Sequence, residues 1–311
     1  MIKYAIILLD KISTSFCHAD NTYSESELIP LDTLRSAIRW CMKENLRIQF
    51  VYPDYELPQE YLYTIDSIDH ADIKHKQHAD VAVYNGWREF ANYDDDTSAV
   101  IIRLYKTELF DNRHALLAAL SPKRHISIVI IDIETFSHQD METYQQLLSE
   151  IATTAKDLIV KGKMPQISIL TDRLMLSAMN NCNAGEESIT IAPNGKFYVC
   201  PAFYYENAED NVGNLIDGLN IRNSQLYKLT YAPMCRNCDA WHCRRCVWLN
   251  RKTTLEVNTP SHEQCVVSHL ERNSAHALLN SVRQFGEFLP GTEIPEIDYL
   301  DPFDKIIKTY H

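Results

Sequence analysis

The chain has 311 residues, of which 45% are hydrophobic, and its formal net charge is −12. It is long enough for two domains or one large α/β domain, and its 17 Tyr and 10 Phe residues exclude a disordered chain. The acidic balance argues against nucleic acid as a partner, because duplex binding requires clustered Lys and Arg side chains.

The N-terminal sequence MIKYAIILLDK contains a short apolar run over residues 5–9. The run is too short for the apolar region of a signal peptide and is followed by Asp10, so we expect a buried first strand. No stretch approaches the roughly 18 apolar residues that span a bilayer, and the sequence predicts no membrane segment. We therefore expect a cytoplasmic protein, in which CxxC pairs more often bind metal or carry out redox chemistry than form structural disulfides.

Strand and helix patterns alternate through the first part of the chain. Apolar periodicity predicts helices over residues 31–45 and 141–160, and near-continuous Ile and Val runs are typical of parallel strands buried on both faces. The alternation predicts a parallel sheet with helices outside it, as a partial (β/α) barrel or an open sheet. About six strands in about 170 residues are too few for a complete eight-stranded barrel. The predicted strands cover residues 4–9, 47–51, 81–84, 99–104, 126–132 and 166–170.

The composition changes near residue 180, because seven of the nine cysteines lie between Cys182 and Cys265. We predict an α/β partial barrel at 1–178, a Cys-rich domain with a closing helix at 179–285, and an acidic tail at 286–311. Within the Cys-rich domain, the strings ESITIA and KFYVC are expected to form a β-hairpin around the turn PNG.

The segment MCRNCDAWHCRRC, residues 234–246, contains four cysteines in two CxxC pairs. Such turns direct two thiolates toward one ion or cluster, and thiolates bind both zinc and iron. One structural zinc would need only these four cysteines. Two four-iron clusters would need eight ligands, which the seven cysteines nearly provide. Cys182, Cys200 and Cys265 could instead be buried apolar cysteines, so spacing alone leaves these alternatives open.

The order Cys182, Gly195, Cys200, the four-cysteine segment and Cys265 resembles the SPASM domain. That domain is the C-terminal extension of radical S-adenosylmethionine (SAM) enzymes that mature ribosomally made peptides and proteins. The strings CNAG, PNGKFYVCP and VGNLIDG match the family's style, and WHCRRCVWLN resembles more narrowly the CXXX-repeat peptide maturases. The x2/x4/x2 spacing departs from the family's commonest x2/x5/x3. The resemblance implies one or two auxiliary [4Fe–4S] clusters, one held by Cys182, Cys200 and Cys246 and the other by Cys235, Cys238, Cys243 and Cys265.

The first of these clusters lacks one ligand in this sequence. Full members of the family carry a further cysteine shortly upstream of the position of Cys182, whereas TDRLMLSAMNN contains none. We therefore expect an open iron or a non-cysteine ligand there. An open iron could bind a thiolate of a cysteine-containing peptide.

The N-terminal half lacks what the resemblance requires for radical chemistry. Active members carry CxxxCxxC after the first strand, but DKISTSFCHADNTYSES contains only Cys17. His18 could replace one ligand but not two, and Cys41 is expected in the core of helix 31–45. The string VYPDYELP has no glycines where the family has a GGE-type motif. The resemblance thus implies a degenerate radical SAM-like barrel, no metal role for Cys17 and no binding of S-adenosylmethionine.

Other candidate sites have fewer supporting residues. His75 and His78 would share a helix face and suit a metal, but with His70 they lie in a polar stretch for which a solvated loop or helix face is expected. The aspartates at 94–96 are expected to form a charged turn. Asp132 and Glu134 follow a strand, where α/β active sites usually lie, without partner residues.

We predict an accessory, radical SAM-like subunit for the maturation of a ribosomally synthesised, cysteine-containing peptide. Its partners would be a catalytically complete radical SAM enzyme, in a heterodimer, and the precursor peptide. Its clusters would bind peptide or relay electrons. The alternative is a zinc-stabilised peptide-binding module without a redox function, and a third possibility is an independent enzyme that uses Asp132 and Glu134.

Overall fold

A computed structural model describes residues 1–92, 97–176, 181–243 and 246–286. The aspartates at 94–96 and all but the first residue of the predicted acidic tail lie outside the described residues.

Nine strands form one sheet in the order β7-β6-β5-β4-β3-β2-β1-β8-β9. The first seven run parallel, β8 pairs in parallel with the free side of β1, and β9 is antiparallel to β8. This mostly parallel α/β architecture confirms the predicted fold class. The strands are β1 (Tyr4–Leu8), β2 (Arg47–Val51), β3 (Ala71–His75), β4 (Val81–Asn85), β5 (Ala99–Leu104), β6 (His125–Ile130), β7 (Gln166–Ile167), β8 (Ser188–Ile191) and β9 (Phe197–Tyr198).

All six predicted N-terminal strands are present, and the sequence missed only β3 among the first seven. Its sequence ADIKH buries Ile73 alone, so it lacks the apolar pattern of its neighbours. The expectation of a loop or helix around His75 was therefore wrong. The strand is fixed by its pairing with β2 and β4 rather than by its own composition.

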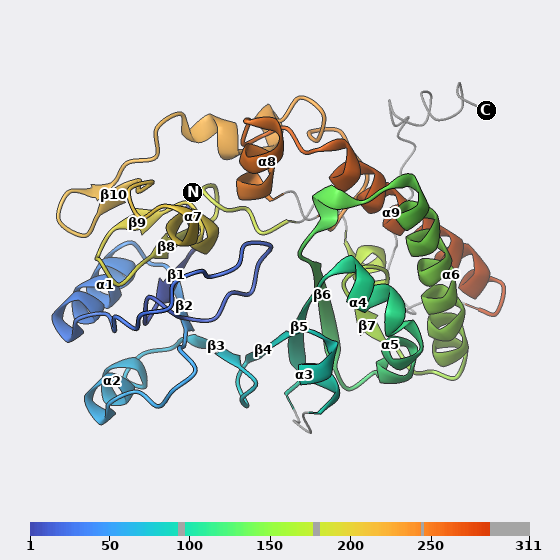
Figure 1. Cartoon of the computed structure of the whole chain (residues 1–311), viewed down its shortest axis with the longest axis horizontal. Coiled ribbons are helices and arrows are strands. Elements are labelled where there is room, and N and C mark those ends of the chain that lie inside the picture. The colour runs from blue at the N-terminus through green and yellow to red at the C-terminus, as the bar shows by residue number, and fades with distance from the viewer. Residues whose placement is uncertain (93–96, 177–180, 244–245, 287–311) are drawn as a thin grey trace.

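Helices cover the outside of the sheet (Figure 1), with α1 and α2 over the β1–β2 end and α3 to α6 over the β4–β6 end. The predicted helix at 31–45 is α1 and the one at 141–160 is α6, which begins at a capping box between Ser137 and Asp140. The helices of this part are α1 (Leu31–Lys43), α2 (Gln59–Ile65), α3 (Trp87–Ala91), α4 (Lys106–Asp111), α5 (Arg113–Ala119) and α6 (His138–Val160).

Two hydrophobic clusters bury the two faces of the sheet. Ala5 and Ile7 of β1 belong to the cluster beneath α1, whereas Ile6 and Leu8 belong to the larger cluster that also contains residues of α6. Because successive side chains of a strand point to opposite faces, β1 is buried on both sides, as its apolar run predicts.

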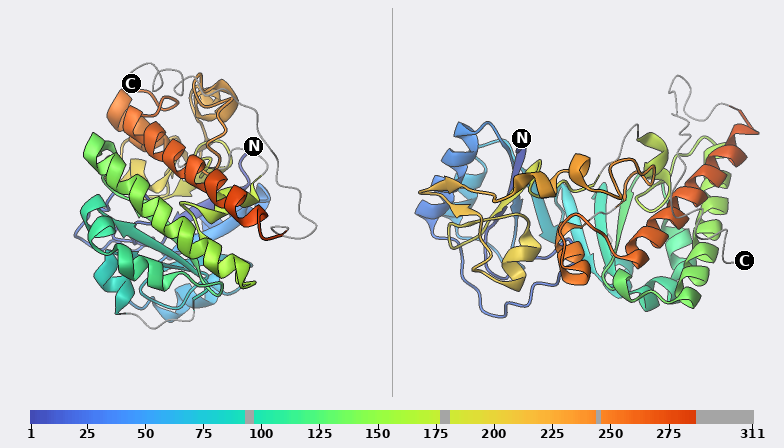
Figure 2. Two further views of the ribbon diagram at one scale, coloured as in Figure 1. Left: turned by 90° about the vertical axis from the view of Figure 1, so that its right-hand side faces the viewer. Right: turned by 90° about the horizontal axis from the view of Figure 1, so that it is seen from above.

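The C-terminal part extends the sheet and then crosses the molecule. The predicted hairpin is β8 and β9, followed by the helix α7 (Pro201–Glu206) and the small ribbon β10 (Gly213–Asn214) and β11 (Gly218–Leu219). Figure 2 shows the chain running from the ribbon through α8 (Val247–Thr254) to α9 (His262–Arg283), which lies along α6. The predicted closing helix is thus present. The domain boundary near residue 178 stays a prediction, and both β8 and the larger apolar cluster continue the barrel core across it.

Within the described residues, no helix combines the length and apolar character needed to cross a membrane.

Candidate functional site

Four cysteines from distant parts of the chain gather beside the barrel. Cys17 lies in the loop after β1, Cys182 precedes β8, Cys200 precedes α7 and Cys246 precedes α8. Cys17, Cys182 and Cys246 line one cavity of about 310 Å³, together with Cys243. The thiol of Cys200 is electrostatically coupled to those of Cys17, Cys246 and Cys182. We call Cys17, Cys182, Cys200 and Cys246 the first thiol group.

Burial and the neighbouring thiols disfavour ionisation of Cys200 and Cys246 in the first thiol group. Burial raises the pKa of Cys200 well above its ordinary value, and the neighbouring thiols add to the rise. Burial also raises the pKa of Cys246, with Cys182 as the next contribution. Thiols in such a group cannot all ionise unless a cation compensates their charge, and bound iron or zinc would supply it. The backbone N–H of Leu249, in the first turn of α8, donates to Sγ of Cys246 at 3.5 Å.

The second thiol group contains Cys235, Cys238, Cys243 and Cys265. Burial raises the pKa of Cys238 to about 12, and Cys243 and Cys235 are among the charges that add to it. Ser268 of α9 donates its hydroxyl to Sγ of Cys243 at 3.2 Å. Cys265 lies in the first turn of the same helix. The hydrogen bond of Ser268 joins this helix to the four-cysteine segment.

His269 adds a nitrogen to the second group that the sequence did not predict. Its Nε2 lies 3.6 Å from Sγ of Cys238. The sequence does contain a spacing that points to His269, because Cys265 and His269 are four residues apart on one helix and therefore share a face. This spacing could be interpreted only once the closing helix was known to pack against the four-cysteine segment.

Buried ion pairs hold that segment against α9. Arg272 donates to Asp239 at 2.6 Å, with both side chains buried. Arg173 donates both to the carbonyl oxygen of Trp241 and to Glu271. These bonds connect the segment to α9 through desolvated side chains, so they fix its position in the absence of regular secondary structure.

The chemistry of the two thiol groups suits a soft metal. Thiolates bind both zinc and the iron of [4Fe–4S] clusters, so the donor atoms are compatible with either. In the described residues, no set of three or more His, Cys, Asp or Glu side chains forms a group that could hold one metal ion.

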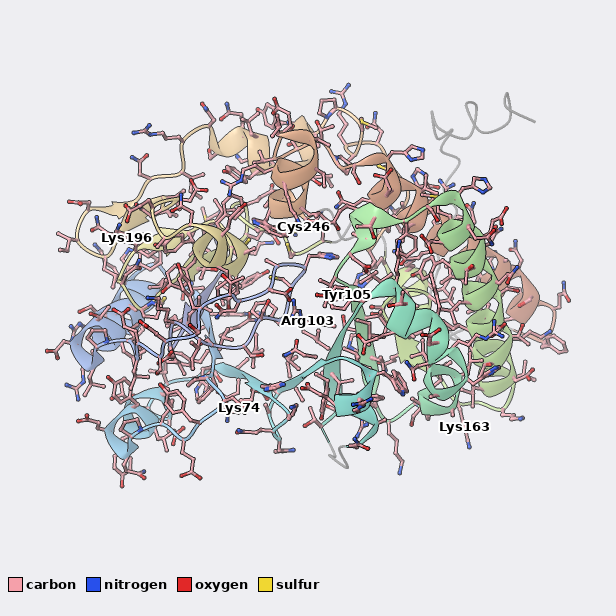
Figure 3. All side chains as sticks on the ribbon, in the orientation of Figure 1. Lys74, Arg103, Tyr105, Lys163, Lys196 and Cys246 are labelled. Atoms are coloured by element: carbon pink, nitrogen blue, oxygen red, sulfur yellow. The ribbon has the colours of Figure 1, made fainter. Side chains whose placement is uncertain are left out.

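A second cavity, of about 410 Å³, opens where the parallel strands end, and most of the residues that line it are polar or charged. The buried Arg103 of β5 donates to the carbonyl oxygens of Cys17 at 2.8 Å and Ala19 at 3.1 Å, and to the carboxylate of Asp20 at 2.6 Å. It also donates to the side chain of Asn85. Figure 3 shows Arg103 in the middle of the molecule, with Cys246 above it. Arg103 thus binds three acceptors of the loop after β1.

The other side chains that the sequence offered as candidate sites make structural contacts. His75 lies on β3, with Nδ1 3.2 Å from Asp54 and Nε2 3.0 Å from Glu89. Asp132 accepts the backbone N–H of Lys106, and Glu134 accepts from Lys252 at 3.0 Å. For the other candidates, His70 contacts the carbonyl oxygen of Ile68, His78 lies between β3 and β4, and Cys41 is buried in the core beneath α1, as expected.

No family model matches the chain, and no curated protein matches it. Solved structures of anSMEcpe, an anaerobic sulfatase-maturating radical SAM enzyme with a SPASM domain, are similar. Its complex with AdoMet and the Cp18Cys peptide aligns with a TM-score of 0.56 at 11% identity, covering 91% of this chain and 100% of that chain. A histidine-tagged form with bound AdoMet aligns with a TM-score of 0.57 at 12% identity, covering 99% of each chain. This chain therefore has a fold of the radical SAM/SPASM type.

Proposed function

We propose that this protein is an accessory subunit in the maturation of a ribosomally synthesised, cysteine-containing peptide. It holds one or two [4Fe–4S] clusters on its C-terminal cysteines and acts with a catalytically complete radical SAM enzyme. The clusters bind the peptide or relay electrons, which are the roles that thiolate-bound clusters can fill without generating a radical themselves.

The supporting observation is the contrast between the two cavities. One cavity is lined by Cys182, Cys243 and Cys246 of the Cys-rich region, whereas the loop after β1 offers one cysteine, Cys17, and is organised by Arg103. A maturation role is further supported by the similarity in fold to anSMEcpe, which was solved with AdoMet and a peptide. In this proposal AdoMet is a ligand of the partner enzyme and not of this chain.

Metal analysis after anaerobic purification and reconstitution tests the proposal. We expect iron and acid-labile sulfide in equal amounts, with the broad visible absorption of a cluster, and no retention of AdoMet in equilibrium dialysis. Colourless protein that contains zinc would refute the cluster. Turnover of a peptide by the isolated chain with AdoMet would refute the accessory role.

The alternative of a zinc-stabilised peptide-binding module has one specific observation in its favour. Nε2 of His269 lies 3.6 Å from Sγ of Cys238, and a Cys3His set is a common zinc donor set. In that case His269→Ala would lower zinc content as strongly as Cys238→Ala. If the second group holds a cluster on four cysteines, His269→Ala should leave iron content unchanged.

A further inference from the structure

We propose that Cys17, from the barrel loop, is the fourth cysteine ligand of the cluster held by Cys182, Cys200 and Cys246. The inference rests on the proposed function, since it assumes that this region binds iron. The sequence predicted no metal role for Cys17, and it predicted an open iron or a non-cysteine ligand in this cluster. The inference replaces both predictions.

The first step is geometric. Cys17 lies on the wall of the same 310 Å³ cavity as Cys182 and Cys246, although 165 and 229 residues, respectively, separate them from it in the chain (182 − 17 and 246 − 17). Cys200 packs against the same apolar cluster as Cys17 and Cys246. The fold therefore assembles four thiols from four different loops.

The second step is a count of ligands. Two four-iron clusters require about eight thiolates, and the Cys-rich region supplies seven of the nine cysteines in the chain. Cys17 is the eighth. The ninth, Cys41, is fully buried in the core beneath α1, in a hydrophobic cluster separate from the one that contacts Cys17, Cys200 and Cys246.

The third step is that Cys17 is held in place. Arg103 binds its carbonyl oxygen at 2.8 Å, and the hydroxyl of Ser15 lies 3.6 Å from its Sγ. The next residue, His18, is buried, with Nδ1 2.9 Å from the carbonyl oxygen of Ile130 on β6. A flexible loop would lose conformational entropy on binding a cluster, whereas this loop is already ordered by side chains of the barrel. Arg103 is thus a positioning residue for the ligand.

Ligation by Cys17 has a structural consequence. The cluster would bridge the loop after β1, the segment before β8 and the first turns of α7 and α8. It would connect the barrel to the Cys-rich region and leave no iron of this cluster open to a peptide thiolate in the resting protein.

The test compares the full-length protein with Cys17→Ala, Cys182→Ala and Cys41→Ala after the same anaerobic reconstitution. The wild-type chain should contain about eight irons. In Cys17→Ala we expect either loss of about four irons or conversion of one cluster to a paramagnetic three-iron form after mild oxidation. Cys182→Ala should behave in the same way, and Cys41→Ala should match the wild type in iron and in its EPR spectrum.

Rescue by a small thiol separates loss of a ligand from loss of folding. Reconstitution of Cys17→Ala with iron and sulfide in the presence of 2-mercaptoethanol should restore the four-iron EPR spectrum of the reduced protein, because the added thiolate can ligate the iron that lacks Cys17. A short synthetic cysteine-containing peptide should change the spectrum of Cys17→Ala and not that of the wild type. If Cys17→Ala has the iron content and spectrum of the wild type, or the wild-type spectrum responds to the peptide, the assignment is overturned while the proposed function stands. A wild-type chain without iron would overturn both.

Discussion

The loop after β1 and the four-cysteine segment before α8 are both irregular, but they are held by different means. In the loop, the buried Asp10 accepts from the hydroxyls of Ser26 and Tyr55 and from backbone N–H groups, and Arg103 binds two carbonyl oxygens. Over its described residues 234–243, the four-cysteine segment has turns in place of regular secondary structure and is anchored by Asp239 and by the carbonyl oxygen of Trp241. Its thiols are buried at Cys235 and half-buried at Cys238 and Cys243.

The comparison predicts which part of the protein depends on the proposed clusters. The polar groups of the loop after β1 are paired with other protein groups, so its conformation does not require an ion. In the four-cysteine segment, burial raises the pKa of the Cys238 thiol. Binding of iron to its thiolate would stabilise this segment, because metal binding and folding are coupled in small Cys-rich modules.

The largest expected effect is that of iron removal. Chelation under reducing conditions should unfold the four-cysteine segment over residues 234–243 and leave the sheet folded, since the strands and α6 are packed by apolar residues. Hydrogen exchange measured by mass spectrometry should show loss of protection in the C-terminal peptides and retention of protection in β5 and β6. Equal loss of protection in both regions would contradict the comparison.

Cys238→Ala should have the next largest effect. Loss of one ligand of the second thiol group should lower the iron content by about four per chain and lower the melting temperature of the C-terminal region. Cys41→Ala is the matched control, because it removes a buried thiol from the barrel core without touching either group. If Cys238→Ala retains full iron and an unchanged melting temperature, Cys238 is not a ligand.

The sequence predicted the elements of this comparison but not their contacts. Six strands, two long helices, the hairpin and the closing helix all have an apolar periodicity or a turn signature, and each is local in the sequence. The missed strand β3 is determined by its neighbours. The sequence also did not predict that Cys17 and Cys246 line one cavity, because their proximity results from how the Cys-rich region crosses the barrel. The role of Arg103 could not be predicted either, because a single Arg in an apolar strand does not indicate which carbonyl oxygens it will bind.

Arg103→Met tests the metal-independent side of the comparison. It removes the Arg103 hydrogen bonds to the carbonyl oxygens of Cys17 and Ala19, the second of which still accepts from the hydroxyl of Ser15, and a lost partner in a buried site costs about 1–3 kcal/mol. We expect a loss of about 3 kcal/mol in the free energy of unfolding of the barrel, measured by urea denaturation. Asp20→Asn should cost less than about 1 kcal/mol, because the Asp20 side chain is 51% exposed. An equally small effect of both variants would show that the loop does not depend on the arginine.

The smallest effect concerns the start of α6, where no cysteine is involved. The hydrogen bond from Lys106, at 2.8 Å, and those from Ser137 lower the pKa of Asp140 to about 2. A carboxylate with a lowered pKa stabilises the folded state above its unfolded pKa of about 4, and this contribution is lost as the pH falls toward 2. Because the Asp140 side chain is 24% exposed, we expect Asp140→Asn to cost about 1–2 kcal/mol at pH 7 and almost nothing at pH 2, measured by urea denaturation across that range. The loss of unfolding free energy that Asp140→Asn causes at pH 7 should be the same in iron-loaded and iron-free protein, because α6 is packed in the barrel core. If this loss disappeared when iron was removed, the barrel, too, would depend on the metal.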